Sequence, residues 1–305
     1  MTNKNMPKIS KYYWFVILAG ALSGFVVFGG QVLSNLGLSL LEISIIPFLI
    51  SLIILVPIVI AKKQWQVRKG TLALFMWFGV VEALIVLCQF GALKLGASVA
   101  VTVLLLYTQP LWTMLISYLF MKEKISRKDI FACILVLLGM ILLVNPFNLQ
   151  GTPAGIIVAL LGGIGLSGWI TIGSFASKNN NPPLNTYFIS RLFMTLFLFI
   201  GFFVMSKYIS DTNIVRLNFS FSIMIWGALA LFGLIAELMN NIFYLKGVEK
   251  VPTVKAGIVM LLEPIVGAVL AAIFLHQPIT SGIIIGGALI LIANYLVIRS
   301  SNTGK

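Results

Sequence analysis

Long apolar stretches recur from one end of this 305-residue sequence to the other. A helix that crosses a lipid bilayer needs about 20 mostly apolar residues. Ten segments meet that requirement, roughly 12–33, 40–61, 70–91, 97–120, 128–146, 154–177, 185–206, 222–245, 254–275 and 280–299. The polar stretches between them are too short to hold a soluble catalytic or binding domain. We therefore expect an all-α membrane protein with ten transmembrane helices.

The composition agrees with a chain that uses lipid as its solvent. Hydrophobic residues make up 60% of the sequence and charged residues 10%, and the mean hydropathy is +1.07. Soluble domains contain about 45–50% apolar and about 25% charged residues. The formal net charge of +13 does not indicate a nucleic-acid partner, because the basic residues lie in short clusters between apolar runs. We expect a multi-pass protein of the cytoplasmic (inner) membrane of a prokaryote.

The basic residues predict the orientation of the chain, because lysine and arginine are enriched in cytoplasmic loops. With the N-terminus in the cytoplasm, 17 of the 21 lysine and arginine residues fall on the cytoplasmic side. The outer loops then hold only Lys94, Lys207 and Arg216, and Arg191 lies within a span. Both termini are therefore predicted to be cytoplasmic, with tails at 1–11 and 300–305.

The sequence contains an internal repeat. At an offset of 154 residues, the segment 90–144 aligns without gaps to 244–298 and places Gln109-Pro110 on Glu263-Pro264. The chain then consists of one five-helix repeat at 12–146 and a second at 154–299. Because five is an odd number, the second repeat must be inverted in the membrane. The charges agree, since basic residues at 122–128 correspond to uncharged residues at 276–282.

Inverted repeats are typical of secondary transporters, in which two inverted halves surround a substrate site near the bilayer midplane. The alternative is a duplicated helix bundle without a transport role. The sequence contains no phosphate-binding GxxxxGK[ST] loop, HExxH helix or GxSxG elbow. We therefore expect neither an ATP-driven pump nor an enzyme.

These features resemble the drug/metabolite transporter superfamily, specifically its EamA-type exporters. The segment 104–110 reads LLLYTQP, Glu123 follows thirteen residues after Pro110, and the segment 261–264 reads LLEP. Arg191 also matches a family position, whereas Gln277 stands where the family usually has a second glutamate. The resemblance implies a ten-helix exporter. Related proteins move amino acids, other metabolites, nucleotide sugars and drugs, so it does not identify the substrate.

Polar side chains within the spans are the candidates for a substrate site, because ionisable groups at membrane depth are costly. Glu237, Asn240, Asn241 and Tyr244 have helical spacing and form one polar stripe. The predicted cavity residues are Glu82, Gln89, Tyr107, Gln109, Trp169, Glu237, Asn240, Asn241, Tyr244 and Glu263. Glu82 and Glu237 are the candidates for proton coupling. The alternative is that these residues only form hydrogen bonds between helices.

Three further positions carry structural hypotheses. Pro110 and Pro264 lie mid-span at matching repeat positions, and each frees the carbonyl four residues before it, so they are candidate hinges. The alternative is that they shape static packing. Arg191 is predicted to extend toward the inner interface as an anchor, with substrate-anion binding as the alternative.

The favoured function is a secondary transporter that exports a small metabolite, amino acid or toxic compound. The alternatives are an importer or exchanger of an anionic metabolite, such as a phosphate ester or nucleotide sugar, and an intramembrane lipid enzyme. The expected partners are a small-molecule substrate and the lipid bilayer, in a monomer or homodimer. We expect no cofactor and no metal, because Cys88 and Cys133 have no metal-binding spacing.

Overall fold

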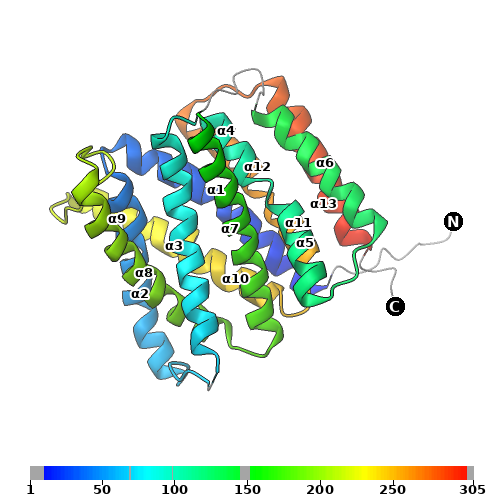
Figure 1. Cartoon of the computed structure of the whole chain (residues 1–305), viewed down its shortest axis with the longest axis horizontal. Helices are drawn as coiled ribbons and strands as arrows, with labels where there is room; N and C mark the ends of the chain where they lie inside the picture. Colours follow the sequence, from blue (N-terminus) through cyan, green and yellow to red (C-terminus); the bar gives the residue numbers. More distant parts are fainter. Residues whose placement is uncertain (1–9, 69, 98, 145–151, 301–305) are drawn as a thin grey trace.

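The computed structural model describes residues 10–68, 70–97, 99–144 and 152–300, which form helices and no strand. Most of the tails predicted at 1–11 and 300–305 therefore lie outside the described residues. The elements (Figure 1) are α1 (Lys11–Asn35), α2 (Leu40–Ala61), α3 (Leu72–Lys94), α4 (Val99–Leu106), α5 (Gln109–Met121), α6 (Arg127–Val144), α7 (Pro153–Lys178), α8 (Pro183–Tyr208), α9 (Ile223–Phe232), the π-helix η2 (Gly233–Met239), α10 (Asn240–Gly247), α11 (Thr253–Met260), α12 (Glu263–Leu275) and α13 (Ser281–Ser300).

Nine segments of the described residues are long and apolar enough to cross a membrane. The predicted span at 128–146 corresponds to α6, an 18-residue helix that is not among them. Arg127, Lys128 and Asp129 occupy its first turn, and the residues after Val144 at the predicted end are not described. The predicted count of ten membrane helices therefore stays a prediction.

Two of the predicted spans are not single helices. The span at 97–120 divides into α4 and α5, and the span at 254–275 divides into α11 and α12. α4 ends at Leu106 and α11 ends at Met260. These are the residues four positions before Pro110 and Pro264, and their carbonyls have no helical partner because proline lacks a backbone N–H. Adding 154 to the bounds of α4 and α5 gives the bounds of α11 and α12.

The glycines of long helices make room for the two helix breaks. A Cβ on Gly20 of α1 would lie 2.9 Å from the carbonyl oxygen of Val259, near the end of α11. A Cβ on Gly163 of α7 would likewise meet the carbonyl oxygen of Leu105, near the end of α4. The break after α11 therefore packs against a glycine of the first predicted repeat, and the break after α4 packs against a glycine of the second.

The predicted helix at 222–245 is also irregular. A seven-residue π-helix, η2, separates α9 from α10 and contains Glu237. At Gly233, the first residue of η2, a Cβ would lie 2.7 Å from the carbonyl oxygen of Pro47 in α2. π-Helical segments within α-helices are frequent at functional sites. The regular 3.6-residue period assumed for the Glu237 stripe therefore does not hold at its start.

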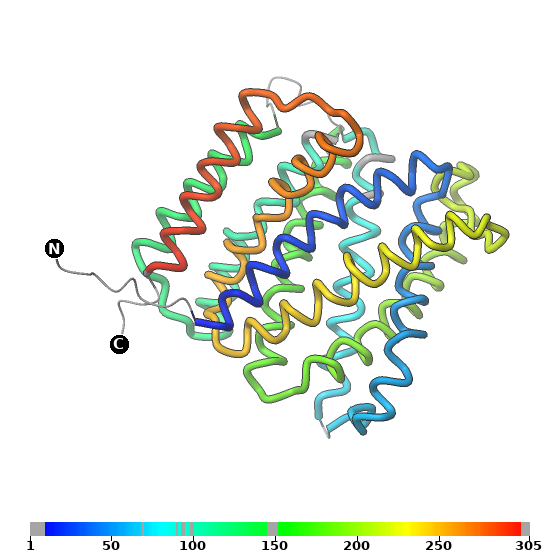
Figure 2. Tube along the Cα trace, turned by 180° about the vertical axis from the view of Figure 1, so that it is seen from behind, coloured from blue at the N-terminus to red at the C-terminus, as the bar shows by residue number. Residues whose placement is uncertain are grey.

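The helices form a layered bundle. Helices α3, α7 and α5 lie at the front in Figure 1, whereas α1 and α10 lie behind them and are at the front of the reverse view in Figure 2. α6 and α13 form an antiparallel pair at one edge, where Gly139 and Gly286 bring the two backbones together. The start of α1 and the end of α13 lie at the same end of the bundle (Figure 2).

Candidate functional site

One arginine joins two carboxylates inside the bundle. Nη2 of Arg191 on α8 lies 3.2 Å from Oε1 of Glu82 on α3, and Nη1 lies 3.7 Å from Oε2 of Glu237 on η2. Arg191 is 3% exposed, Glu82 4% and Glu237 7%. We call these three residues the ion cluster. The expectation that Arg191 extends to the interface as an anchor is therefore wrong, because its guanidinium is held inside the bundle by two carboxylates.

Aromatic side chains surround the ion cluster. The rings of Phe48 and Tyr187 each lie 4.8 Å from the central carbon of the Arg191 guanidinium. Trp169 on α7 donates a hydrogen bond of 2.7 Å from Nε1 to Oε1 of Glu82. Tyr244 on α10 stacks on Trp169 with 4.4 Å between the ring centroids. The aromatic rings thus hold both the arginine and one carboxylate in place and limit the access of water.

The charges and hydrogen-bonding atoms of the ion cluster are not all paired. With both carboxylates ionised it carries one net negative charge, in surroundings where an unpaired charge is unfavourable. Oε2 of Glu82 and Nε of Arg191 are buried and have no hydrogen-bond partner among the described residues. Buried polar atoms are usually hydrogen-bonded, so unpaired ones require an explanation. Oε2 of Glu82 is an acceptor that can take up a proton, whereas Nε of Arg191 already carries a hydrogen and lacks an acceptor.

The structure thus brings together four of the predicted cavity residues, Glu82, Trp169, Glu237 and Tyr244. Asn240 and Asn241 are buried beside them on α10. Asn240 accepts a 3.1 Å hydrogen bond from Ser23 of α1, and Asn241 donates one of 2.7 Å to the backbone carbonyl of Glu237.

The hydrogen bond from Ser23 joins two helices, as the alternative interpretation of the polar stripe proposes. Gln89 lies two turns from Glu82 along α3 and is partly buried.

The other predicted residues lie at the helix breaks. Tyr107, between α4 and α5, donates a hydrogen bond to the carboxylate of Glu263, the first residue of α12. Gln109, the first residue of α5, donates a 2.5 Å hydrogen bond to Thr113, which in turn donates to Ser167 of α7. The bond from Tyr107 therefore links the break at Pro110 to the break at Pro264, whereas the bonds that start at Gln109 join α5 to α7.

Phe48, Tyr187 and the pairing of Arg191 were not predicted from the sequence. Tyr187 stands four residues before Arg191, a spacing that places both on one helix face and could have indicated their contact. Phe48 carries no such signal, because its contact depends on how α2 packs against α8.

Two cavities are found elsewhere in the bundle. One, of about 230 Å³, is polar and lies where the α7–α8 connection meets the turn before α11, beside Lys178, Asn181 and Glu249. The other, of about 250 Å³, has an apolar lining from α2, α3 and α8 and the segment after α8.

Neither cavity includes a residue of the ion cluster, so a substrate cavity there stays a prediction. In the described part of the chain, no three His, Cys, Asp or Glu side chains are placed to hold a metal ion.

Comparison with known proteins adds independent information. The EamA-like transporter family matches residues 10–145 and 153–299. A protein of Clostridium kluyveri named an uncharacterized transporter is 28% identical and aligns over 96% of this chain and 94% of its own length. An uncharacterized transporter of Archaeoglobus fulgidus is 23% identical over 79% of this chain and 82% of its own. A solved crystal structure superposes with a TM-score of 0.77 over 95% of this chain and 96% of that chain, at 14% identity, which shows a shared fold.

Proposed function

Because the chain belongs to the EamA-like transporter family, we propose that it is a secondary transporter. It exports a small metabolite, amino acid or toxic compound from the cytoplasm by alternating access, coupled to protons. It acts in the cytoplasmic membrane of a prokaryote, as a monomer or homodimer, and is not an enzyme. Apolar helices long enough to span a membrane support the location, and two relatives named transporters support the activity.

The proposal includes two five-helix halves of opposite orientation, ten membrane helices and both termini in the cytoplasm. The matching bounds of the broken helices support the repeat. Lys122 and His276, 154 residues apart, both end their helices with φ at 53°. The basic residues at 122–128 have uncharged counterparts at 276–282. This difference supports the inversion, because positive charge is enriched on the cytoplasmic side.

The ion cluster is the observation that carries the proton-coupling part of the proposal. A proton that binds Glu82 or Glu237 removes the net negative charge of the cluster and frees that carboxylate from Arg191. The other carboxylate remains paired. Because the two carboxylates come from α3 and η2, and the arginine from α8, protonation changes which of these elements are held together.

The energetics favour this role over a purely structural one. A charged side chain at the bilayer centre costs at least about 2.5 kcal/mol on the mildest scales. An apolar residue could fill a structural position at lower cost. The alternative of an anion exchanger would need a free basic side chain at membrane depth, whereas Arg191 is paired with two carboxylates.

The test is a transport screen in proteoliposomes with an imposed pH gradient. Vesicles with an acidic lumen are offered labelled amino acids, sugars, nucleotides and cationic drugs, and empty liposomes serve as the control. We expect at least one compound to accumulate against its gradient and a protonophore to abolish the accumulation. Accumulation that is the same with and without the pH gradient would contradict proton coupling. Protein that moves no compound in the screen would contradict the transport function.

A further inference from the structure

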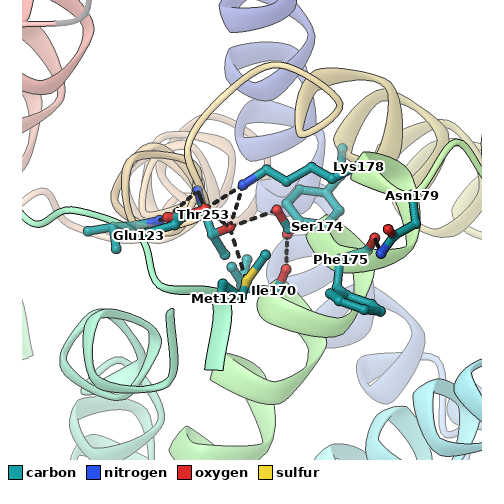
Figure 3. Close-up of polar contacts among 10 residues, drawn as sticks. Met121, Glu123, Ile170, Ser174, Phe175, Lys178, Asn179 and Thr253 are labelled. Carbon is teal, nitrogen blue, oxygen red and sulfur yellow. Dashed lines mark hydrogen bonds and ion pairs between the residues drawn. The ribbon is translucent and has the colours of Figure 1, made fainter. Parts of the chain in front are cut away.

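Three parts of the chain, the α5–α6 turn, α7 and α11, meet around one carboxylate at an end of the bundle. Glu123, in the turn between α5 and α6, accepts hydrogen bonds of 3.0 and 3.1 Å from the backbone N–H of Thr253, the first residue of α11. It also accepts a 2.6 Å bond from the Thr253 hydroxyl and a bond from Nζ of Lys178, the last residue of α7. Figure 3 shows these contacts, with Ser174 of α7 2.7 Å from the Thr253 hydroxyl. We call Glu123, Lys178 and Thr253 the latch.

The local sequence explains why Glu123 is needed at this helix end. The residue before α11 is Pro252, which makes no side-chain hydrogen bond to the helix start. The free N–H groups of a helix start attract a negative charge, and a carboxylate there is favourable. Glu123 therefore caps α11 from a distant part of the chain. The cap joins α11 to the end of α5.

The latch is partly shielded from water. The side chains of Glu123 and Lys178 are 15% and 30% exposed, and Thr253 is fully buried. Burial alone would raise the pKa of Glu123, but the bonds from Lys178 and Thr253 hold that pKa below its ordinary value. The carboxylate is therefore ionised at neutral pH.

The latch has no charged counterpart at the related repeat positions. At the offset of 154, Glu123 corresponds to Gln277 and Thr253 to Val99. A second match between the repeats, in which Leu22-Ser23-Gly24 corresponds to Leu166-Ser167-Gly168 at an offset of 144, places Lys178 on Ser34. A charged pair of the same kind therefore cannot form at the counterpart positions.

We propose that Glu123, Lys178 and Thr253 form a latch that holds the cytoplasmic end of the transporter closed and stabilises the state closed on that side. The cytoplasmic assignment rests on the proposed function. The latch lies at the end of the bundle where α1 begins (Figure 2), the end predicted to be cytoplasmic. In two inverted halves without this difference, the inward-open and outward-open states would have similar energies. The latch stabilises only the state that is closed on its own side. At the other end of the bundle a different ion pair, between Arg216 and Glu42 at 3.0 Å, joins the segment after α8 to the start of α2.

The test measures distances across the latch end without any substrate. Spin labels replace the exposed Lys124 and Lys250 in full-length protein without Cys88 and Cys133, and pulsed electron resonance records the distance distribution in liposomes. Glu123→Gln keeps the size of the side chain and gives it the chemistry of its repeat counterpart. Lys178→Met removes the other charge and preserves the Glu123 cap on Thr253. Glu249→Gln, at the same end but outside the latch, is the matched control.

We expect one short distance in the unmodified background and in Glu249→Gln. Glu123→Gln should raise the ratio of long to short distances at least about tenfold, the change that follows from losing one hydrogen bond to a charged group. Lys178→Met should raise it by a smaller factor. Distributions unchanged in both variants, or changed equally in Glu249→Gln, would overturn the latch.

A second measurement separates the latch from the proposed orientation. A membrane-impermeant thiol reagent is applied to cells that carry a single cysteine in place of Lys124. Labelling only after the cells are opened supports the cytoplasmic position. Labelling of intact cells overturns that assignment and the topology in the proposed function. The distance measurements would still show whether the three residues hold this end closed.

Discussion

Arg191 shares one positive charge between two carboxylates that are far apart in the sequence. An arginine with a single partner would form a neutral pair, whereas the second carboxylate adds a charge that the surroundings do not compensate. The ordinary reason to retain such a group in a membrane protein is function. The excess charge in the cluster is therefore the feature of single residues that most directly supports the proposed proton coupling.

Replacing either carboxylate by glutamine tests this link. Glu237→Gln and Glu82→Gln keep size and hydrogen bonding but remove the acid group. We expect the variant of the coupling residue to lose pH-dependent accumulation by about tenfold or more, because it cannot exchange a proton, and to retain substrate exchange without a gradient. Glu249→Gln should behave as the unmodified protein. If both cluster variants accumulate substrate with the unmodified pH profile, Glu263 becomes the better candidate for proton coupling.

Removing the arginine should affect stability rather than coupling alone. Arg191→Met leaves Glu82 and Glu237 buried together without their shared partner. Loss of one partner from a buried ion pair costs about 3–5 kcal/mol. We expect a lower midpoint of thermal unfolding in detergent. The triple variant Glu82→Gln, Arg191→Met, Glu237→Gln should regain most of the lost thermal stability. Equal unfolding midpoints for Arg191→Met and the unmodified protein would contradict the view that Arg191 compensates the two buried carboxylates.

The two carboxylates of the ion cluster were candidates from the sequence, but their common contact with Arg191 was not predicted. Glu82 and Glu237 were identifiable because charged residues are rare within apolar spans. Their common contact with Arg191 depends on the packing of α8 against α3 and η2, which hydrophobic periodicity does not determine. The same holds for Phe48, whose ring lies over the guanidinium although nothing in the sequence around it indicates a polar neighbour.

Among the elements, the helix breaks show the limit of local sequence rules most clearly. The predicted span 40–61 coincides with α2, and α2 continues through Pro47 and Pro57 without a break. At Pro110 and Pro264 the helices stop instead. A proline alone therefore does not decide between a continuous and a broken helix. The bond from Tyr107 to Glu263 and the glycines packed against Leu105 and Val259 provide the tertiary contacts that accommodate a break.

Alanine at the two breaks tests whether they are hinges. Pro110→Ala with Pro264→Ala restores two backbone N–H groups and favours continuous helices. We expect transport to slow by about tenfold without loss of membrane insertion, because motion at the breaks would be restricted. Pro57→Ala, in the unbroken α2 and exposed, is the matched control and should leave the rate unchanged. A double variant that transports at the unmodified rate would support static packing instead.

For the whole molecule, the number of membrane crossings determines where each end lies. Nine apolar segments of the described residues meet the criteria for a span, and α6 does not because of the charges in its first turn. α6 nevertheless packs along α13, with Gly139 and Gly286 in close contact. If α6 crosses the membrane with its partner, the start of α1 and the end of α13 face the same side, as their common position in Figure 2 suggests.

Labelling from each side of the membrane decides the orientation of the two halves. Single cysteines replace Lys124, after α5, and Pro278, after α12, in protein without Cys88 and Cys133. These positions are 154 residues apart and follow matching helices, so inverted halves place them on opposite sides. We expect a membrane-impermeant reagent to label the cysteine at 278 in intact cells and the one at 124 only after the cells are opened. Labelling of both cysteines from the same side would contradict inverted repeats. Alternating access would then lose its structural basis, because two halves of equal orientation do not generate inward-open and outward-open states by exchanging their conformations.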